Sequence, residues 1–325
     1  MLKKTLVTTA VLAAAWLVGP VVAQTTDFPN KPVRIVVPFP PGGATDITAR
    51  VVAEKLSTKW GQPVVIDNRA GAGGNVGSDL VAKSAPDGYS IVLGVTGSHS
   101  INISLYKKMP YHPLSDFEPL TQATIYPNAI VVNPQVPANN LPELIALLKK
   151  EPGKLSYGSD GNGTASHLGM EILKSKANVQ LTHIPYRGST PMITDLLGGT
   201  LMVGITGLPA VQQHLKAGKL KMIAITTPQR APGAPDYKTV AEQGIANFNA
   251  APWAGFFAPK GTPKPVVDKL AQDLADALKQ PDVVQKMNEL GSTVVGNKPD
   301  EFRQFVSRQI EMWAEGVKIS GATVD

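Results

Sequence analysis

The segment best suited to chemistry is residues 38–46, Pro-Phe-Pro-Pro-Gly-Gly-Ala-Thr-Asp, which follows the apolar run Val33–Val37 and precedes a helical pattern. This order predicts a strand that leads through a glycine-containing loop to a helix N-terminus. The first N–H groups of a helix lack intrahelical partners, and the positive end of the helix dipole lies there, so such a place binds anions. The loop lacks the Gly-Lys-Ser/Thr of a nucleotide P-loop. We therefore expect it to bind a carboxylate.

Two other segments repeat this design. Arg69–Gly77 and Ser159–His167 are both rich in glycine, and each follows an apolar run and opens a helical pattern. Glycine also punctuates ordinary turns, so a plain strand-to-helix connection is the alternative for each loop. The first segment does not match the dinucleotide fingerprint, because the third glycine of Gly-x-Gly-x-x-Gly would fall at Val76. The repetition favours an anion site over nucleotide binding.

Residues 183–191, His-Ile-Pro-Tyr-Arg-Gly-Ser-Thr-Pro, form the other informative stretch. The pattern predicts the end of a strand and then a helix with Thr190 as its N-cap. Tyr186 would supply an aromatic wall of the site, and the backbone at Gly188 would supply hydrogen-bond donors. Arg187 would add a cation. The alternative is that Tyr186 packs in the interior while Arg187 is solvated or paired.

The remaining polar residues do not suggest catalysis or metal binding. The sequence has five histidines, His99, His112, His167, His183 and His214. No two of them have the i, i+4 spacing of a helical metal site, and the nucleophile elbow Gly-x-Ser-x-Gly is absent from the sequence. Two of the histidines, at 99 and 167, lie in or after glycine and serine loops, where each is either a ligand donor or a structural histidine. We expect no metal, no cofactor and no enzyme activity.

The N-terminus has the pattern of a secretory signal. Lys3 and Lys4 precede a mostly apolar stretch, Thr5–Ala23, which ends in Val-Val-Ala. We predict a signal peptide over residues 1–23 with cleavage after Ala23. The alternative is an uncleaved membrane anchor, since about 19 residues nearly span a bilayer. Cysteine is absent, which excludes disulfides and a lipidated cysteine, and we expect a soluble periplasmic protein.

The net charge and the length of the chain narrow the class of protein further. The formal net charge of the 325-residue chain is +6, which includes Lys3 and Lys4, and no block of like charges is present. Such a diffuse charge does not indicate nucleic-acid binding. The length and the 43% apolar composition suggest two domains, or one large one, with an ample core.

Short apolar runs alternate with helical patterns along the chain, which predicts parallel α/β sheets covered by helices on both faces. The predicted strands form two sets: Val33–Val37, Val64–Ile66 and Ile91–Val95, then Ala129–Val132, Lys154–Tyr157, Leu181–Ile184, Leu201–Ile205 and Met222–Thr226. The clearest predicted helices cover Ile47–Trp60, with Thr45 or Asp46 as cap, then Thr190–Leu197, Val211–Lys216, Pro265–Leu278 and Pro299–Val317.

Two connections rich in proline and polar residues, Leu120–Asn128 and Thr226–Pro235, are the predicted crossings between two lobes. One lobe would contain residues 24–124 together with residues 227–325, and the other would contain residues 125–226. A chain that crosses twice has a hinge, and a cleft between hinged lobes is a favoured site for a small molecule.

Five segments carry a resemblance to a known family: Lys31–Asp46, Gly61–Asn75, Ala85–Tyr89, Pro185–Gly188 and Asp195–Gly199. Each piece alone is unspecific, but together they resemble the solute receptors of tripartite tricarboxylate transporters, the TctC-like or Bug receptors. They run from near the predicted mature N-terminus to the second lobe in the order of that family. Residues 96–100 and 203–208 do not map clearly on the family pattern, and we expect them to shape the part of the pocket that contacts the body of the ligand.

The resemblance implies an α/β periplasmic binding protein fold of the second topological type, with two α/β lobes around a central cleft and two hinge crossings. It implies that a small organic carboxylate is held by backbone N–H groups, hydroxyls and water, without a dedicated arginine. Transferred residue by residue, it predicts these ligand-binding positions: Phe39, Gly42, Gly43, Ala44, Thr45, Asp46, Thr96, Ser98, Ser159, Gly161, Gly163, Thr164, His167, Tyr186, Gly188 and Thr190. Asp46 is expected to cap its helix or hold a water molecule, since its charge opposes a carboxylate ligand.

The expected function is that of a monomeric periplasmic receptor that delivers a carboxylate, mono- or dicarboxylate, to membrane permease subunits. A receptor that signals to a sensor kinase is the alternative within the binding class. A secreted enzyme that acts on a carboxylate or acyl substrate is the alternative from a different class.

Overall fold

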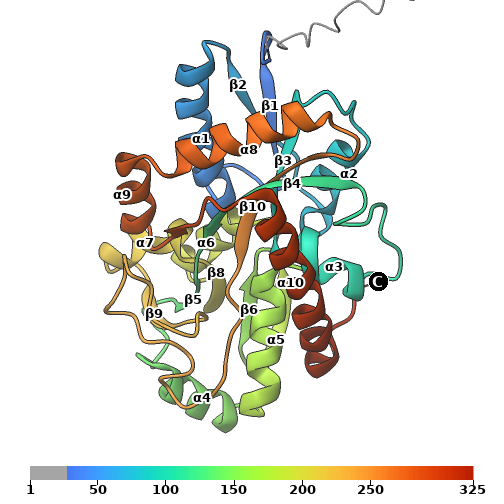
Figure 1. Cartoon of the computed structure of the whole chain (residues 1–325). Coiled ribbons are helices and arrows are strands. Elements are labelled where there is room, and N and C mark those ends of the chain that lie inside the picture. Colours follow the sequence, from blue (N-terminus) through green and yellow to red (C-terminus); the bar gives the residue numbers. More distant parts are fainter. Residues whose placement is uncertain (1–27, 325) are drawn as a thin grey trace, which may run out of the picture.

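The computed structural model describes residues 28–324, and the predicted signal peptide lies outside this range. The described chain forms two lobes, each built on its own β-sheet and covered by helices (Figure 1). None of the helices in this range is both long and apolar enough to cross a membrane.

The first lobe contains a six-stranded sheet in the order β11-β4-β10-β3-β1-β2. Its strands are β1 (Val33–Val37), β2 (Val64–Asn68), β3 (Ser90–Val95), β4 (Phe117–Ile125), β10 (Trp253–Pro259) and β11 (Thr293–Val294). Strand β1 is parallel to both β2 and β3, whereas β10 is antiparallel to β3 and β4. The first three strands were predicted from their apolar runs, and the last three were not.

The second lobe contains a five-stranded sheet in the order β7-β6-β8-β5-β9. Its strands are β5 (Asn128–Val132), β6 (Ser156–Ser159), β7 (Thr182–Pro185), β8 (Val203–Gly207) and β9 (Lys221–Ile225). Strand β6 is parallel to β7 and β8, whereas β5 is antiparallel to β8 and β9. All five strands of this sheet were predicted, with bounds that differ by one or two residues.

Both sheets are therefore mixed, whereas the sequence predicted parallel ones, and the two crossings explain why. Strands β1, β3, β6 and β8 all end at the cavity between the lobes, because the loops that follow them line it. A chain that crosses from one lobe enters the other at this same end. Strand β5 after the first crossing and β10 after the second therefore run away from the cavity, opposite to their neighbours.

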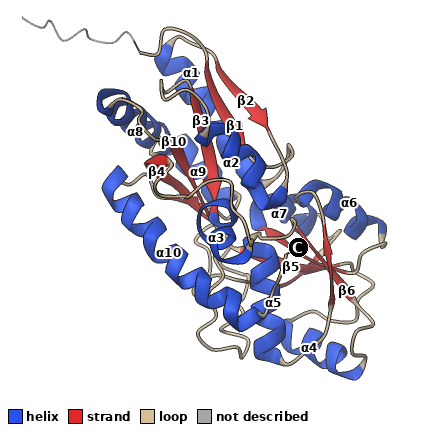
Figure 2. Cartoon of the chain, turned by 90° about the vertical axis from the view of Figure 1, so that its right-hand side faces the viewer, coloured by secondary structure: helices blue, strands red, loops and turns tan. Residues whose placement is uncertain are grey.

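The helices lie on the faces of the two sheets (Figures 1 and 2). The first lobe carries α1 (Ala44–Trp60), α2 (Asn75–Ala82), α3 (Asn102–Leu105), α8 (Lys264–Leu278), α9 (Pro281–Glu289) and α10 (Pro299–Ser320), together with a single π turn, η2 (Gly97–Ile101), and a short 3-10 turn, η1 (Ala72–Gly74). The second lobe carries α4 (Leu141–Lys150), α5 (Ala165–Ala177), α6 (Ser189–Gly198) and α7 (Leu208–Lys216).

Two predicted caps are wrong in the same way. Helix α1 begins after Gly43 and α6 begins after Gly188, so neither Thr45 nor Thr190 is an N-cap. Gly188 has φ +101°, which side chains rarely adopt, and a Cβ atom there would lie 2.7 Å from Cδ of Pro40. Glycine at these two caps leaves the first turns of α1 and α6 accessible from the cavity side.

The chain crosses between the lobes at residues 126–127 and again between β9 and β10. The region around Leu120, which was predicted to be part of a linker, is instead the buried strand β4. Its proline and polar residues resemble a loop in sequence, but their side chains are covered on both faces of the sheet.

Helix α10 contacts both lobes. Near its start, Phe302 packs with Trp253 and Phe257 of the first sheet. Further along, Trp313 is buried in a cluster with Leu168 of α5. Figures 1 and 2 both show this helix running from the first lobe along the second. The predicted residue bounds of the two lobes remain a prediction.

Candidate ligand-binding site

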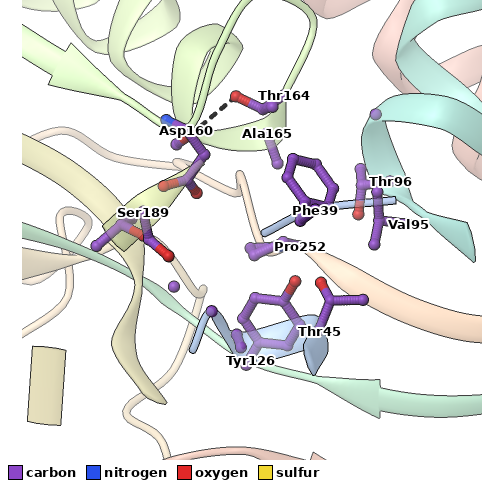
Figure 3. Close-up of a pocket in the computed structure, with 16 residues that line it drawn as sticks. Phe39, Thr45, Val95, Thr96, Tyr126, Asp160, Thr164, Ala165, Ser189 and Pro252 are labelled. Carbon is purple, nitrogen blue, oxygen red and sulfur yellow. Dashed lines mark hydrogen bonds between the residues drawn. The ribbon is translucent and has the colours of Figure 1, made fainter. Parts of the chain in front are cut away.

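A cavity of about 50 Å³ lies between the lobes, and we call it the interlobe cavity (Figure 3). Phe39 and Thr96 line it from the first lobe, and Thr164 and Ser189 line it from the second. Backbone contacts close it: an added Cβ atom on Gly97 would lie only 2.6 Å from the carbonyl oxygen of Gly163 in the opposite lobe. The described chain is therefore in a closed arrangement, in which a small ligand contacts both lobes at once.

Four helices begin at the wall of this cavity. The first residues of α1, α5 and α6, which are Ala44, Ala165 and Ser189, line it, and so does Gly207 immediately before α7. Helix α5 has a side-chain cap, because Thr164 accepts a hydrogen bond from the backbone N–H of His167. Helices α1, α6 and α7 have none. Their N-terminal dipoles converge on one small volume, which favours a negatively charged guest.

Backbone donors remain available at these termini. Within residues 28–324, no other protein group accepts a hydrogen bond from the N–H groups of Ala44, Thr45, Ala165, Ser166 or Ser189. Unpaired N–H groups at a helix start are normally satisfied by caps, water or a ligand. These groups can therefore hold an anionic ligand without any charged side chain.

The loop before α1 is held in place by Asp46. Its carboxylate accepts hydrogen bonds from the backbone N–H of Gly42 at 2.9 Å, from Nε of Arg50 at 2.9 Å and from Nδ2 of Asn68 at 3.0 Å. Burial alone would raise the pKa of Asp46, but these hydrogen bonds outweigh it, and the pKa lies below its usual value. Asp46 is thus a buried anion that fixes the loop, and it neither caps α1, as the sequence suggested, nor lines the interlobe cavity.

The polar side chains of the cavity wall come from both lobes. Figure 3 shows the hydroxyl of Tyr126 beside that of Thr45, with Ser189 and Asp160 across the cavity. Burial raises the pKa of the Tyr126 phenol, which therefore stays protonated and able to donate a hydrogen bond. Asp160 is the only charged residue among those that line the cavity. Burial also raises its pKa, to about 6.

The structure brings together some of the predicted site residues. The interlobe cavity is lined by Phe39, Gly43, Ala44, Thr45, Thr96 and Thr164. A neighbouring hollow, which also contacts Phe39 and Asp160, is lined by Gly161, Tyr186 and Gly188. The hydroxyl of Tyr186 is already engaged there, because it donates a hydrogen bond to Asp195 at 2.7 Å.

The other predicted residues line neither space: Gly42, Asp46, Ser98, Ser159, Gly163, His167 and Thr190. Ser98 lies 2.9 Å from Nδ1 of His99, whose pKa burial lowers to about 3. Ser159 lies 2.7 Å from Nε2 of His183, and this ring stacks on that of His167 with centroids 4.2 Å apart. Burial lowers the pKa of His167 to about 4, so it is neutral at pH 7. For both predicted histidines, the structural alternative fits the observed burial.

Sequence reasoning missed the other wall residues: Val95, Gly97, Tyr126, Asp160, Ala165, Ser166, Ser189, Thr206, Gly207 and Pro252. Several lie inside segments that the sequence had already singled out, such as Ser159–His167. There the segment was predicted, but a neighbouring residue was chosen as the ligand contact. Tyr126 lies in the predicted crossing, where the residues between two lobes face the cleft. Pro252 lies in a segment between the last predicted strand and helix, and no motif marked it. Residues 28–324 hold no cluster of three or more residues suited to bind a metal ion.

Comparisons with known proteins agree with this architecture. The sequence model of the tripartite tricarboxylate transporter family receptor matches residues 48–321. Protein BugT of Bordetella pertussis (strain Tohama I) is 38% identical over 312 residues, which cover 96% of this chain and 95% of that protein.

Solved structures show the same fold. The periplasmic binding protein BugD has 40% identity and a TM-score of 0.87, and the match covers 91% of this chain and 99% of that one. Rpa4515 of R. palustris, solved with adipate, has 36% identity and a TM-score of 0.89, with 92% of this chain and 100% of that one covered. The predicted periplasmic binding protein fold with two lobes is thus confirmed.

Proposed function

We propose that this chain, which belongs to the tripartite tricarboxylate transporter receptor family, captures a small organic carboxylate between its lobes and delivers it to the permease of such a transporter. The family model describes a transporter receptor, and the similar BugD is a periplasmic binding protein, which supports a receptor rather than an enzyme. The carboxylate, the permease and export with cleavage after Ala23 are the parts that we propose.

One observation carries the proposal: four helix N-termini converge on a closed cavity that no lysine or arginine lines. Each terminus is expected to stabilise an anion by about 0.3–1 kcal/mol, in addition to its hydrogen bonds. The cavity lies between the two lobes, where charges are screened less than in open water, and this strengthens these interactions. The adipate bound to Rpa4515, a similar protein, supports a carboxylate as the guest.

Closure of the lobes would convert ligand binding into a signal for the permease. Donors from both lobes reach the same cavity only in the closed arrangement, so a ligand that bridges them binds this state better than an open one. The population then shifts toward a surface in which the two lobes are adjacent. A permease that recognises this surface would distinguish loaded from empty receptor.

The test uses protein purified without added ligand and a panel of mono- and dicarboxylates. We expect a rise in melting temperature with some of these acids, and we expect each acid to be recovered unchanged by mass spectrometry. Chemically altered acid would contradict a receptor and support an enzyme. The absence of any shift or heat of binding across the panel would contradict a carboxylate ligand.

Export and delivery need separate measurements. Intact mass of the protein from the periplasmic fraction should correspond to a chain that begins at Gln24. Affinity capture on the loaded receptor should retain permease subunits in detergent, and the ligand-free receptor should retain fewer. Equal retention of both forms would contradict recognition of the closed state.

A further inference from the structure

Asp160 lies in the loop between β6 and α5, at the wall of the interlobe cavity. The loop is tied down locally. The backbone N–H of Asp160 donates to Oγ of Ser166 at 3.1 Å, and Oγ1 of Thr164 donates to the carbonyl oxygen of Gly161 at 2.7 Å. Figure 3 shows the Asp160 side chain directed into the cavity, opposite the side of Tyr126 and Thr45. The position of the Asp160 backbone is therefore fixed by hydrogen bonds within the loop.

One oxygen of the carboxylate lacks the partner that a buried anion normally has. Its Oδ1 atom is buried and has no hydrogen-bond partner within residues 28–324. The hydroxyls of Thr206 and Ser166 lie near it and favour the charged form, but burial outweighs them. Because its pKa is about 6, the group is still mostly ionised at pH 7. A buried and unpaired polar group in a folded protein calls for an explanation, and an unfilled ligand contact is one.

Asp160 does not serve as an internal substitute for the ligand's carboxylate. If it did, backbone N–H groups of the nearby helix termini would donate to it. Within the described residues, none does, and the donors of α1, α5 and α6 stay available. Tyr126 is the other titratable residue that lines the cavity, and its phenol stays protonated. The cavity thus contains an anion-binding part and, separately, a fixed anion.

This combination selects among carboxylic acids. A dicarboxylate would place a second anion in the same small volume as Asp160, where no lining residue carries a compensating positive charge. An acid that also bears an ammonium group would pair its carboxylate with the helix termini and its N–H donors with Asp160. A hydroxy acid would donate a hydrogen bond to the Asp160 carboxylate but would leave the negative charge of that carboxylate uncompensated.

On the basis of the proposed function, we infer that Asp160 is a specificity-determining residue that accepts a hydrogen bond from an ammonium group of the ligand. The ligand is then an amino acid, in the broad sense of a carboxylate that carries an ammonium group, and not a plain dicarboxylate. Asp160 makes this choice by repelling a second carboxylate as well as by attracting the cation.

The experiment is isothermal titration calorimetry at pH 7.5 with matched acids of the same carbon skeleton. In each set the acids differ only in one group, which is methyl, hydroxyl, ammonium or carboxylate, placed either next to the carboxylate or at the far end of the chain. We expect the ammonium acid to bind at least tenfold tighter than the dicarboxylate of the same set. This first arm needs no variant, so it does not depend on how a mutation affects folding.

The second arm compares Asp160→Asn and Asp160→Ser with the wild-type protein. Each variant should lower the ratio of ammonium-acid affinity to dicarboxylate affinity at least tenfold, through weaker binding of the first and tighter binding of the second. Asp268→Asn, an exposed aspartate in α8 that pairs with Lys264, makes the same change in net charge and should leave the ratio unchanged.

The outcomes separate the two proposals. If dicarboxylates bind wild-type protein at least as tightly as ammonium acids do, and Asp160→Asn leaves the ratio unchanged, the inference about Asp160 is wrong while the carboxylate receptor stands. If no acid of any set binds to wild-type protein or variants, both fail.

Discussion

Oγ1 of Thr190, in the first turn of α6, donates a 2.9 Å hydrogen bond to the carbonyl oxygen of Pro41 in the loop before α1. The two residues belong to different lobes, so this bond exists only while the lobes are together. It lies beside the interlobe cavity, because Gly43 and Ser189, which neighbour the two partners, both line the wall. Thr190 was predicted as a ligand contact, but in the structure it links the two lobes.

Replacing Thr190 by valine should speed ligand release. The variant keeps the shape of the side chain and loses one hydrogen bond at an exposed site, which is worth about 1 kcal/mol, or roughly a fivefold change in dissociation rate. Stopped-flow displacement of a bound acid measures the rate. Thr194→Val removes a hydroxyl that bonds only within α6, to the carbonyl oxygen of Thr190, and should leave the rate unchanged. Equal rates in both variants would show that the lobes do not depend on this bond.

Gly97→Ala should block closure with only a small effect on the first lobe. Gly97 lies at the start of η2 without a positive φ, and within its own lobe the added Cβ atom would lie 3.0 Å from the carbonyl oxygen of Gly73, which must shift by a few tenths of an ångström. In the closed arrangement, however, its Cβ atom would lie 2.6 Å from the carbonyl oxygen of Gly163, closer than real contacts allow. Ligand-induced stabilisation should be lost, while the ligand-free melting temperature should stay within a few degrees of that of the wild-type protein. Small-angle scattering with ligand should show a larger radius for the variant than for the wild-type protein.

Gly198→Ala is the matched control for this experiment, because nothing lies within 4 Å of the added Cβ atom. It should bind ligand as the wild-type protein does. Wild-type affinity in Gly97→Ala as well would mean that the ligand-bound state is more open than the arrangement described above.

Asp46→Ala should destabilise the protein and weaken ligand binding together. The change leaves the donors of Gly42, Arg50 and Asn68 without their acceptor, and we expect a loss of about 2 kcal/mol in the free energy of unfolding at pH 7. The folded-state pKa of Asp46 is lowered, so its contribution is present above the ordinary pKa of 3.8 and fades as the pH falls below it. Urea unfolding of both proteins at pH 7 and pH 3 measures this loss and its dependence on pH.

The difference between wild-type protein and Asp46→Ala should therefore shrink toward pH 3. Asp268→Ala removes an exposed carboxylate and should change the free energy of unfolding by less than about 0.5 kcal/mol at either pH. A difference for Asp46→Ala that is the same at pH 7 and pH 3 would mean that the charge of Asp46 is not what stabilises the loop.

Asp160→Asn should make the ligand-free protein more stable at high pH. Burial raises the pKa of Asp160 from 3.8 to about 6, so the folded state favours the protonated form. That advantage is fully present below pH 3.8 and is lost as the pH rises through about 6. In the closed arrangement, where this burial occurs, the wild-type protein therefore carries a cost of up to about 3 kcal/mol at pH 8, which asparagine removes. In urea unfolding without ligand, the variant should have a higher free energy of unfolding than wild type at pH 8 and the same value near pH 4.

A variant that is less stable than wild type at pH 8 would mean that the Asp160 carboxylate has partners in the ligand-free protein. The measurement is independent of the identity of the ligand. It therefore tests the electrostatic basis of the specificity argument separately from binding.

The sequence predicted the second sheet better than the first, for a physical reason. Strands such as Ala129–Val132 are apolar runs between clear turn signals, and propensity alone identifies them. Strand β4 contains Pro119, Thr121 and Gln122, which resemble a loop in the sequence. In the fold, β4 pairs with β10 on one side and β11 on the other. Whether a segment is buried between two others is a property of the tertiary fold, and local composition does not report it.

The candidate site was predicted at the level of loops and not of side chains. Glycine spacing identified the loop before α1 and the loop at 159–167, and both reach the cavity. Which residue of a loop faces inward depends on its turn geometry. In the second loop Asp160 and Thr164 reach the wall, whereas Ser159 and His167 turn to the interior. The family resemblance carried no information on this choice at Asp160.

The path of α10 affects how the chain can fold during its synthesis. Trp313 and Val324 complete the buried cluster that also holds Leu168, Ile205 and Phe248 of the second lobe. Both residues come after the last strand of that lobe, β9, and so leave the ribosome after it. Until then part of the core of the second lobe is uncovered. The middle segment of the growing chain is therefore not a complete domain by itself. This arrangement delays compaction of the second lobe until α10 has been made.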